Sequence, residues 1–135
     1  MTAINTILLI EDSETDILLI QRAIKDAGLK SEVIVKTDGE TALRYLFDAL
    51  TLPNLVLLDL SLPGMSGLEV LQKIRAHDKT HLLPVVILTG SDRESDKVAT
   101  LGLGADRYVQ KPVDFYEFVT RVQELGVYYL ELKRR

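Results

Sequence analysis

Five short apolar runs alternate along this chain with five longer segments whose apolar residues recur at helical spacing. Such alternation indicates parallel strands joined by right-handed helical crossovers. Because the runs are apolar along their whole length, both faces of the sheet must be covered, and the pattern predicts an α/β fold, a three-layer sandwich. Strands are expected at residues 4–10, 32–36, 54–59, 84–89 and 107–109. Helices are expected at residues 14–27, 38–50, 66–76, from a Ser91 cap to 103, and from an Asp114 cap to about 130.

The length and composition agree with one globular domain. The chain has 135 residues, of which 47% are hydrophobic and 27% charged, and this is enough for a single core. No linker, repeat or low-complexity segment divides it. We therefore expect residues 1–135 to form a single domain with no attached output domain.

Charge and hydropathy argue against several classes of protein. A net charge of -4 argues against a broad nucleic-acid surface. The chain shows neither a signal peptide nor an apolar stretch long enough to span a bilayer. Cysteine is absent, which excludes disulfides and thiolate zinc sites and agrees with a reducing compartment. We expect a cytoplasmic protein with no membrane contact and no direct nucleic-acid binding.

Short polar signals mark the ends of the predicted helices. These signals are an N-cap at Ser13, a stop at Gly28, and capping boxes that pair Thr37 with Glu40 and Ser91 with Glu94. The apolar inward stripe of the first helix is predicted to comprise Ile17, Leu18, Ile20 and Ile24, and it is interrupted at Gln21.

Polar side chains follow four of the predicted strands. Glu11 and Asp12 come after the first strand, Asp59 ends the third, Thr89 ends the fourth, and Lys111 follows the fifth. The carboxyl ends of parallel strands lie at one edge of a sheet, where open α/β folds bind their ligands. We therefore expect three acids, a hydroxyl and an ammonium to meet at this edge.

This set of side chains favours phosphoryl chemistry. Crowded carboxylates repel one another and need a cation, and oxygen ligands without histidine or cysteine favour Mg²⁺. A carboxylate such as Asp59 can act as a nucleophile and become an aspartyl phosphate. Lys111 would then neutralise charge on the phosphoryl group together with the metal.

The chain resembles the response-regulator receiver domains of two-component signalling over essentially its whole length. The matching motifs are Ile-Glu-Asp at Ile10–Asp12, the segment Leu57–Gly67, Leu-Thr-Gly at Leu88–Gly90, and Ala-Asp-Arg-Tyr-Val-Gln-Lys-Pro at Ala105–Pro112. The resemblance implies a flavodoxin-like fold with strand order 2-1-3-4-5 and the site at the switch point.

The resemblance also implies roles for the site residues. Asp59 would be the phosphoacceptor. Asp12 and Asp59 would ligate Mg²⁺ through carboxylate oxygens, Ser61 through its backbone carbonyl, and Glu11 largely through water. The protein would be a signalling module that catalyses only its own phosphorylation and dephosphorylation.

Other positions would carry the switch. Thr89 would bind the acquired phosphoryl group and Lys111 would pair with its oxygens. Tyr108 would turn inward as Thr89 moves, and it can be a half-buried strand residue in one state and the inward switch residue in the other. The Lys111–Pro112 bond is expected to be cis. The output surface would comprise the fourth helix, the fifth strand and the fifth helix.

Alternative interpretations remain open at some positions. An aspartate-nucleophile phosphatase would carry a second acid two residues after the nucleophile, where this chain has Ser61. Ser91 can cap a helix or influence dephosphorylation. Glu14 and Asp16 are interpreted as partners of the helix dipole rather than as metal ligands.

The expected partners are a sensor histidine kinase, an unidentified downstream protein and a second copy of the chain. Residues 111–118 and an aromatic tail resemble small regulators paired with phytochrome-type kinases, although the tail pair here is Tyr128 and Tyr129. These two tyrosines either complete the packing of the last helix or form an exposed interface.

Overall fold

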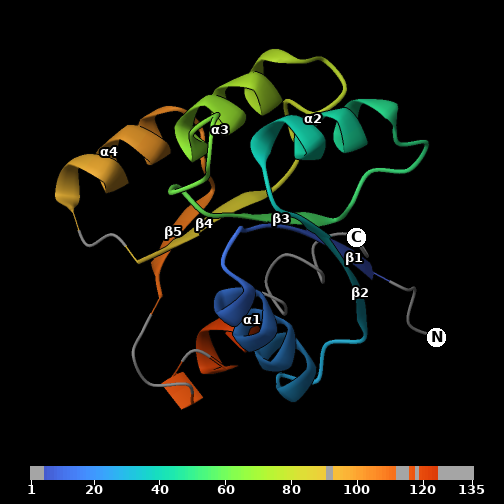
Figure 1. Ribbon diagram of the computed structural model, residues 1–135, viewed down its shortest axis with the longest axis vertical. Coiled ribbons are helices and arrows are strands. Elements are labelled where there is room, and N and C mark those ends of the chain that lie inside the picture. Colours follow the sequence, from blue (N-terminus) through green and yellow to red (C-terminus); the bar gives the residue numbers. More distant parts are fainter. Residues whose placement is uncertain (1–4, 91–92, 112–115, 118, 125–135) are drawn as a thin grey trace.

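The protein forms one parallel sheet with helices on both faces (Figure 1). The structure, a computed structural model, describes residues 5–90, 93–111, 116–117 and 119–124. The five strands lie in the order β2-β1-β3-β4-β5, as predicted, and every neighbouring pair is parallel. Their bounds are β1 (Asn5–Ile10), β2 (Ser31–Lys36), β3 (Leu55–Leu58), β4 (Val85–Thr89) and β5 (Arg107–Gln110).

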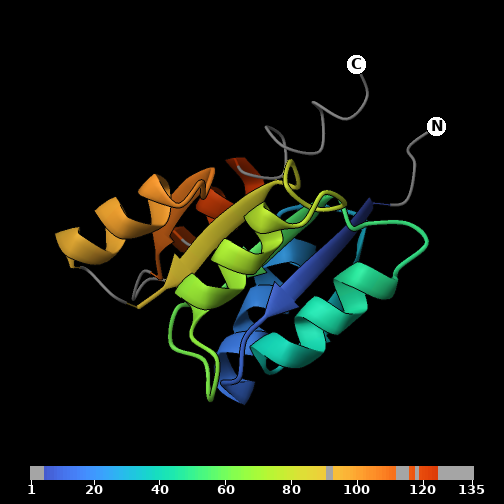
Figure 2. The same cartoon turned by 90° about the horizontal axis from the view of Figure 1, so that it is seen from above.

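The helices form the two outer layers of the sandwich. One face carries α2 (Gly39–Asp48), α3 (Gly67–Ala76) and α4 (Glu94–Gly102), which lie one beside another in Figure 2. The other face carries α1 (Glu14–Asp26) and the helical residues 116–117 and 119–124, which belong to the predicted fifth helix. Both expected ends of that helix, at 114 and 130, lie outside the described residues. In the described part of the chain, no helix has the length and apolarity needed to cross a bilayer.

Each strand supplies side chains to two separate cores. Successive side chains of a strand point to opposite faces. Ile7 and Leu9 of β1 therefore join the core under α1, while Leu8 and Ile10 join the core under α2 and α3. All four are almost fully buried, which explains why the predicted strands are apolar along their whole length.

One predicted core position of α1 is wrong. Ile20, Ala23 and Ile24 are buried, but Leu18 is 67% exposed. Successive residues advance about 100° around a helix, so Leu18 falls on the opposite side from these three. Ala23 occupies the buried position that the prediction omitted.

Side-chain hydrogen bonds confirm the predicted start of α1 and correct the predicted cap of α2. Ser13 caps α1, because its hydroxyl accepts a hydrogen bond from the backbone N–H of Asp16 at 3.3 Å. At α2 the cap is Asp38 rather than Thr37, and its carboxylate accepts the N–H of Thr41 at 2.8 Å. A carboxylate one residue closer to the first turn reaches that N–H directly, so the Thr37–Glu40 box is not formed.

The predicted cap of α4 is also wrong, whereas the predicted stop of α1 is correct. Helix α4 begins at Glu94 and its N-cap is Arg93, which makes no side-chain capping bond. The helix starts too late for Ser91 to be its cap, and Ser91 itself lies outside the described residues. Gly28 ends α1 with a φ of +80°, a conformation that glycine adopts without strain.

Candidate functional site

The candidate site lies at the carboxyl ends of β1, β3, β4 and β5. Backbone hydrogen bonds continue past the ends of these strands and hold the site residues in register. The N–H of Asp59 donates to the carbonyl of Ile10 at 3.0 Å, and the N–H of Lys111 donates to the carbonyl of Thr89 at 2.7 Å. The residues predicted to meet at this edge are therefore brought together by the sheet itself.

Three carboxylates gather where β1 and β3 end. Glu11, Asp12 and Asp59 each offer an oxygen, and these three oxygens lie within 4.8 Å of one another. Glu11 is 1% exposed and Asp59 is 6% exposed, whereas Asp12 is open to solvent. Buried carboxylates at this spacing repel one another unless a cation is present, and an all-oxygen set fits Mg²⁺ or Mn²⁺. An ion held there would keep its waters on the solvent side, where Asp12 is exposed.

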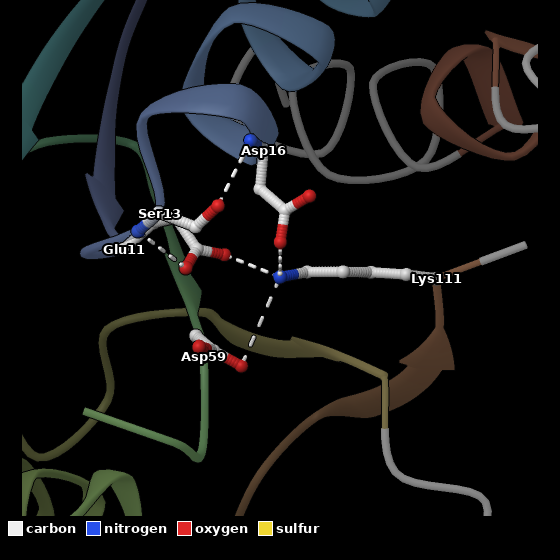
Figure 3. Close-up of polar contacts among 5 residues, drawn as sticks. All are labelled: Glu11, Ser13, Asp16, Asp59 and Lys111. Carbon is white, nitrogen blue, oxygen red and sulfur yellow. Dashed lines mark hydrogen bonds and ion pairs between the residues drawn. The ribbon is translucent and has the colours of Figure 1, made fainter.

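Lys111 reaches into this cluster from the end of β5 (Figure 3). Its Nζ donates hydrogen bonds to Glu11 Oε1 and, at 2.8 Å, to Asp16 Oδ2. The nearest oxygen of Asp59 is 3.9 Å away, which is an ion-pair distance and not a hydrogen bond. The ammonium is therefore held between Glu11 and Asp16, with Asp59 close by.

The electrostatics of the pair favour the charged lysine. Burial is the largest influence on Lys111 and lowers its pKa. The hydrogen bonds that Lys111 donates to Asp16 and Glu11, together with the charge of Asp59, outweigh burial, so the pKa of Lys111 is raised. Burial raises the pKa of Glu11, and the charge of Asp59 adds to this rise. Lys111 offsets part of the rise in the pKa of Glu11. A further cation beside Glu11 would therefore stabilise the charged form of its carboxyl group.

Asp16 is a site residue that sequence reasoning missed. It was interpreted as a partner of the α1 dipole, yet its carboxylate binds Lys111. Ser13 connects the two parts of this arrangement, since its hydroxyl caps α1 at Asp16 and its N–H donates to Glu11 Oε2 at 3.2 Å. The available signal was an acid in the first turn after a strand whose end carries the expected site.

The remaining predicted residues surround the cluster. Thr89 is buried at the end of β4, and Tyr108 is half-buried on β5 and packs against the core under α3. Ser61 is exposed in the loop after Asp59. That loop borders a groove of about 450 Å³ lined by Leu60, Ser61, Ser66, Leu68, Gly90, Arg93 and Asp96. The groove gives the site an open flank toward α4.

Four residues to which the sequence analysis gives a functional role lie outside the described part of the chain. They are Ser91, Pro112, Tyr128 and Tyr129. The cis bond before Pro112 and the aromatic interface of the tail therefore stay predictions.

Comparison with known proteins agrees with this geometry. The response regulator receiver domain model matches residues 7–123. Response regulator Rcp1 of Synechocystis is 35% identical over 130 residues, which cover 93% of this chain and 88% of that protein.

Two solved structures resemble the fold closely. The phosphorylated cyanobacterial phytochrome response regulator RcpA has a TM-score of 0.87 at 32% identity, with 95% of each chain covered. The Mn²⁺-bound form of Rcp1 has a TM-score of 0.83 at 35% identity, covering 94% of this chain and 95% of that one.

Proposed function

The chain belongs to the response regulator receiver domain family, and from this membership we propose that it accepts a phosphoryl group on Asp59 from a histidine kinase. The observation that carries the proposal is the position of Asp59 between an acidic pair and the ammonium of Lys111. This arrangement surrounds one nucleophilic carboxylate with the groups that a phosphoryl group requires.

The proposed reaction is a transfer between two side chains. One carboxylate oxygen of Asp59 attacks the phosphorus of a phosphohistidine on the kinase. An O–P bond forms as the P–N bond breaks, and the departing imidazole nitrogen keeps the electron pair and takes up a proton from solvent. The phosphoryl group thus remains on Asp59 as an acyl phosphate.

A divalent ion would be held by the carboxylates of Asp12 and Asp59, by the carbonyl of Ser61, and by Glu11 largely through water. When bound, Mg²⁺ neutralises charge on the oxygens of the transferring group. The Mn²⁺ in the Rcp1 structure supports this assignment, as does the all-oxygen composition of the cluster.

Lys111 and Thr89 are proposed to hold the acquired group. A phosphoryl group adds about 1.5 to 2 negative charges and three acceptor oxygens, so the Lys111 ammonium is its natural counter-charge. Thr89 ends the neighbouring strand and its hydroxyl would donate to another phosphoryl oxygen. The shift of Thr89 would open space for Tyr108, and this would change the surface formed by α4, β5 and the predicted fifth helix.

The proposed partner is a phytochrome-type histidine kinase. This follows from the relatives that are phytochrome response regulators, RcpA among them. The proposed output is contact with a downstream protein or with a second copy of the chain, for which Tyr128 and Tyr129 are the candidate side chains. An aspartate-nucleophile phosphatase is not favoured, because Ser61 stands where the second acid would be needed.

The test is phosphorylation in vitro, followed by intact-protein mass spectrometry. With Mg²⁺ and acetyl phosphate, the wild type is expected to gain one phosphoryl group and Asp59→Asn to gain none. Asp48→Asn, which removes an exposed acid from the end of α2, is the matched control and is expected to behave as the wild type. Phosphorylation of Asp59→Asn at the wild-type level would overturn the proposal.

A further inference from the structure

Lys111 divides its donors unequally among the carboxylates around it. An ammonium has three N–H donors. Two of them serve Glu11 and Asp16, while Asp59 lies beyond hydrogen-bond distance at 3.9 Å. The residue proposed to serve the phosphoryl group is therefore bonded mainly to other partners in the unphosphorylated protein.

The bond to Asp16 is anchored by the first turn of α1. The Asp16 N–H is fixed on the Ser13 hydroxyl, so the carboxylate leaves the helix at a set position above Lys111 (Figure 3). Asp16 is 35% exposed at its side chain, whereas Glu11 is 1% exposed. Of the two partners, Asp16 is thus the carboxylate that water can hydrate after Lys111 moves away.

A phosphoryl group on Asp59 would compete for the same donors. It brings three acceptor oxygens next to an ammonium that already uses two of its three N–H groups. Lys111 can bond several of those oxygens only if it gives up a present partner. The exchange with Asp16 has a free-energy cost, and this cost lowers the stability of the phosphorylated state.

We propose that Asp16 is a positioning residue that holds Lys111 in the unphosphorylated protein and so limits how long Asp59 keeps its phosphoryl group. The inference rests on the proposed function, since it concerns the same site. Asp16 is not one of the three carboxylates of the acidic cluster, and it would act on the phosphoryl group only through Lys111. It sets the balance between the two states of the switch.

Asp16→Asn tests the proposal with two measurements at saturating Mg²⁺. These are the Kd of beryllofluoride, a phosphoryl analogue followed by ¹⁹F NMR, and the half-life of phosphorylated Asp59 after the donor is removed. Because solvent weakens a bond to a one-third exposed carboxylate, we expect affinity and half-life to rise about three- to tenfold rather than more. Asp16→Glu, which restores the charge, should return both values toward wild type.

Glu14→Gln is the matched control. Glu14 is the other acid in the first turn of α1 and it is exposed, so this variant makes the same charge change next to the same helix end. The beryllofluoride Kd and the half-life of this variant are expected to stay within about twofold of wild type, because the ammonium of Lys111 is bonded to Glu11 and Asp16. Asp16→Ala serves as a second uncharged variant, and circular dichroism checks that each variant is folded.

The outcomes separate the two proposals. If wild type takes up neither beryllofluoride nor a phosphoryl group, the proposed function fails. If wild type takes up both and Asp16→Asn matches Glu14→Gln, or shows weaker affinity and a shorter half-life, only the role of Asp16 is overturned.

Discussion

Gly67 at the start of α3 lies directly against the backbone of Asp59. A Cβ atom on Gly67 would come within 2.4 Å of the Asp59 carbonyl oxygen and 2.7 Å of the Leu60 Cα. The N–H of Gly67 also donates to the Leu60 carbonyl at 3.1 Å. The position of Asp59, the proposed phosphoacceptor, therefore depends on the absence of a side chain at Gly67.

Gly67→Ala is expected to disturb both the fold and the site. The clash involves backbone atoms, which cannot rotate away, so we expect a loss of more than about 2 kcal/mol in the free energy of unfolding. We also expect weaker Mg²⁺ binding, because the loop carrying Ser61 must move. Urea unfolding and calorimetric Mg²⁺ titration measure the two effects.

Gly102→Ala is the control for this substitution. Gly102 ends α4 and has nothing within 4 Å of a Cβ position. Alanine there should be neutral or stabilising by up to about 1 kcal/mol. Equal effects at Gly67 and Gly102 would contradict the role assigned to the close contact.

Mg²⁺ is expected to stabilise the folded protein. The ion would relieve the repulsion among the carboxylates of Glu11, Asp12 and Asp59. The unfolded chain does not hold these carboxylates together, so the ion binds the folded state preferentially. Ligand linkage gives about 2.7 kcal/mol at a free Mg²⁺ concentration about one hundred times its Kd. Urea unfolding with and without Mg²⁺ measures the gain. Asp12→Asn should lose most of the gain and Asp48→Asn should keep it, and equal gains in both variants would exclude Asp12 as a ligand.

The sheet and the acidic cluster were predictable from the sequence for the same physical reason. Alternating strands and helices leave few topologies, and parallel strands bring their carboxyl ends to one edge. Glu11 and Asp59 follow neighbouring strands, so their proximity needed no knowledge of side-chain packing. The placement of Lys111 at the same edge followed from the end of β5.

The missed contact of Asp16 and the wrong core position at Leu18 both concern information that a short stretch of sequence lacks. Asp16 bonds Lys111, which is 95 residues further along the chain, and a rule about helix ends cannot register such a partner. Leu18 is apolar, yet its predicted place on the inward stripe is wrong. Which side of α1 faces the sheet is decided by tertiary packing, and this side is the one with Ile20 and Ala23.

A pair of alanine substitutions tests the orientation of α1. Ile20→Ala removes a side chain that is 1% exposed and should cost about 2 to 5 kcal/mol in the free energy of unfolding. Leu18→Ala should change it by no more than about 0.5 kcal/mol, because the side chain is mostly in solvent. Urea unfolding measures both. A larger loss from Leu18→Ala would mean that α1 faces the sheet differently.

Arg75 connects α3 to the opposite edge of the sheet, away from the acidic cluster. Its guanidinium donates to the carbonyls of Gly104 at 2.9 Å and Leu83 at 2.7 Å, and to Asp106 Oδ2 at 3.1 Å. The same Asp106 oxygen accepts the N–H of Val85 at 2.8 Å. Only a planar group with several fixed donors can make these three bonds at once.

Arg75→Lys is therefore expected to be destabilising although it keeps the charge. We expect a loss of about 1 to 3 kcal/mol in the free energy of unfolding, with Mg²⁺ affinity unchanged. Arg22→Lys, in an exposed pair with Asp26 at 3.7 Å on α1, should cost less than about 0.5 kcal/mol. Urea unfolding of both variants makes the comparison, and equal losses would show that the guanidinium geometry is unimportant.

Asp38 gives the fold a pH dependence in acid. The Thr41 N–H, and after it the Thr41 hydroxyl at 3.0 Å, lower the pKa of this carboxyl below its usual 3.8. A lowered pKa contributes stability that is present above 3.8 and is lost as the pH falls through the folded-state value. An asparagine side chain at this position would keep the capping oxygen without ionising, so Asp38→Asn isolates the charge.

The stability difference between wild type and Asp38→Asn should therefore be constant near neutral pH and shrink in acid. Urea unfolding between about pH 3 and pH 6 measures this difference. Asp48→Asn, which removes another acid of the same helical region, is measured alongside as the comparison for the loss of one negative charge. A gap for Asp38→Asn that widens as the pH falls would mean that the carboxylate does not stabilise the start of α2.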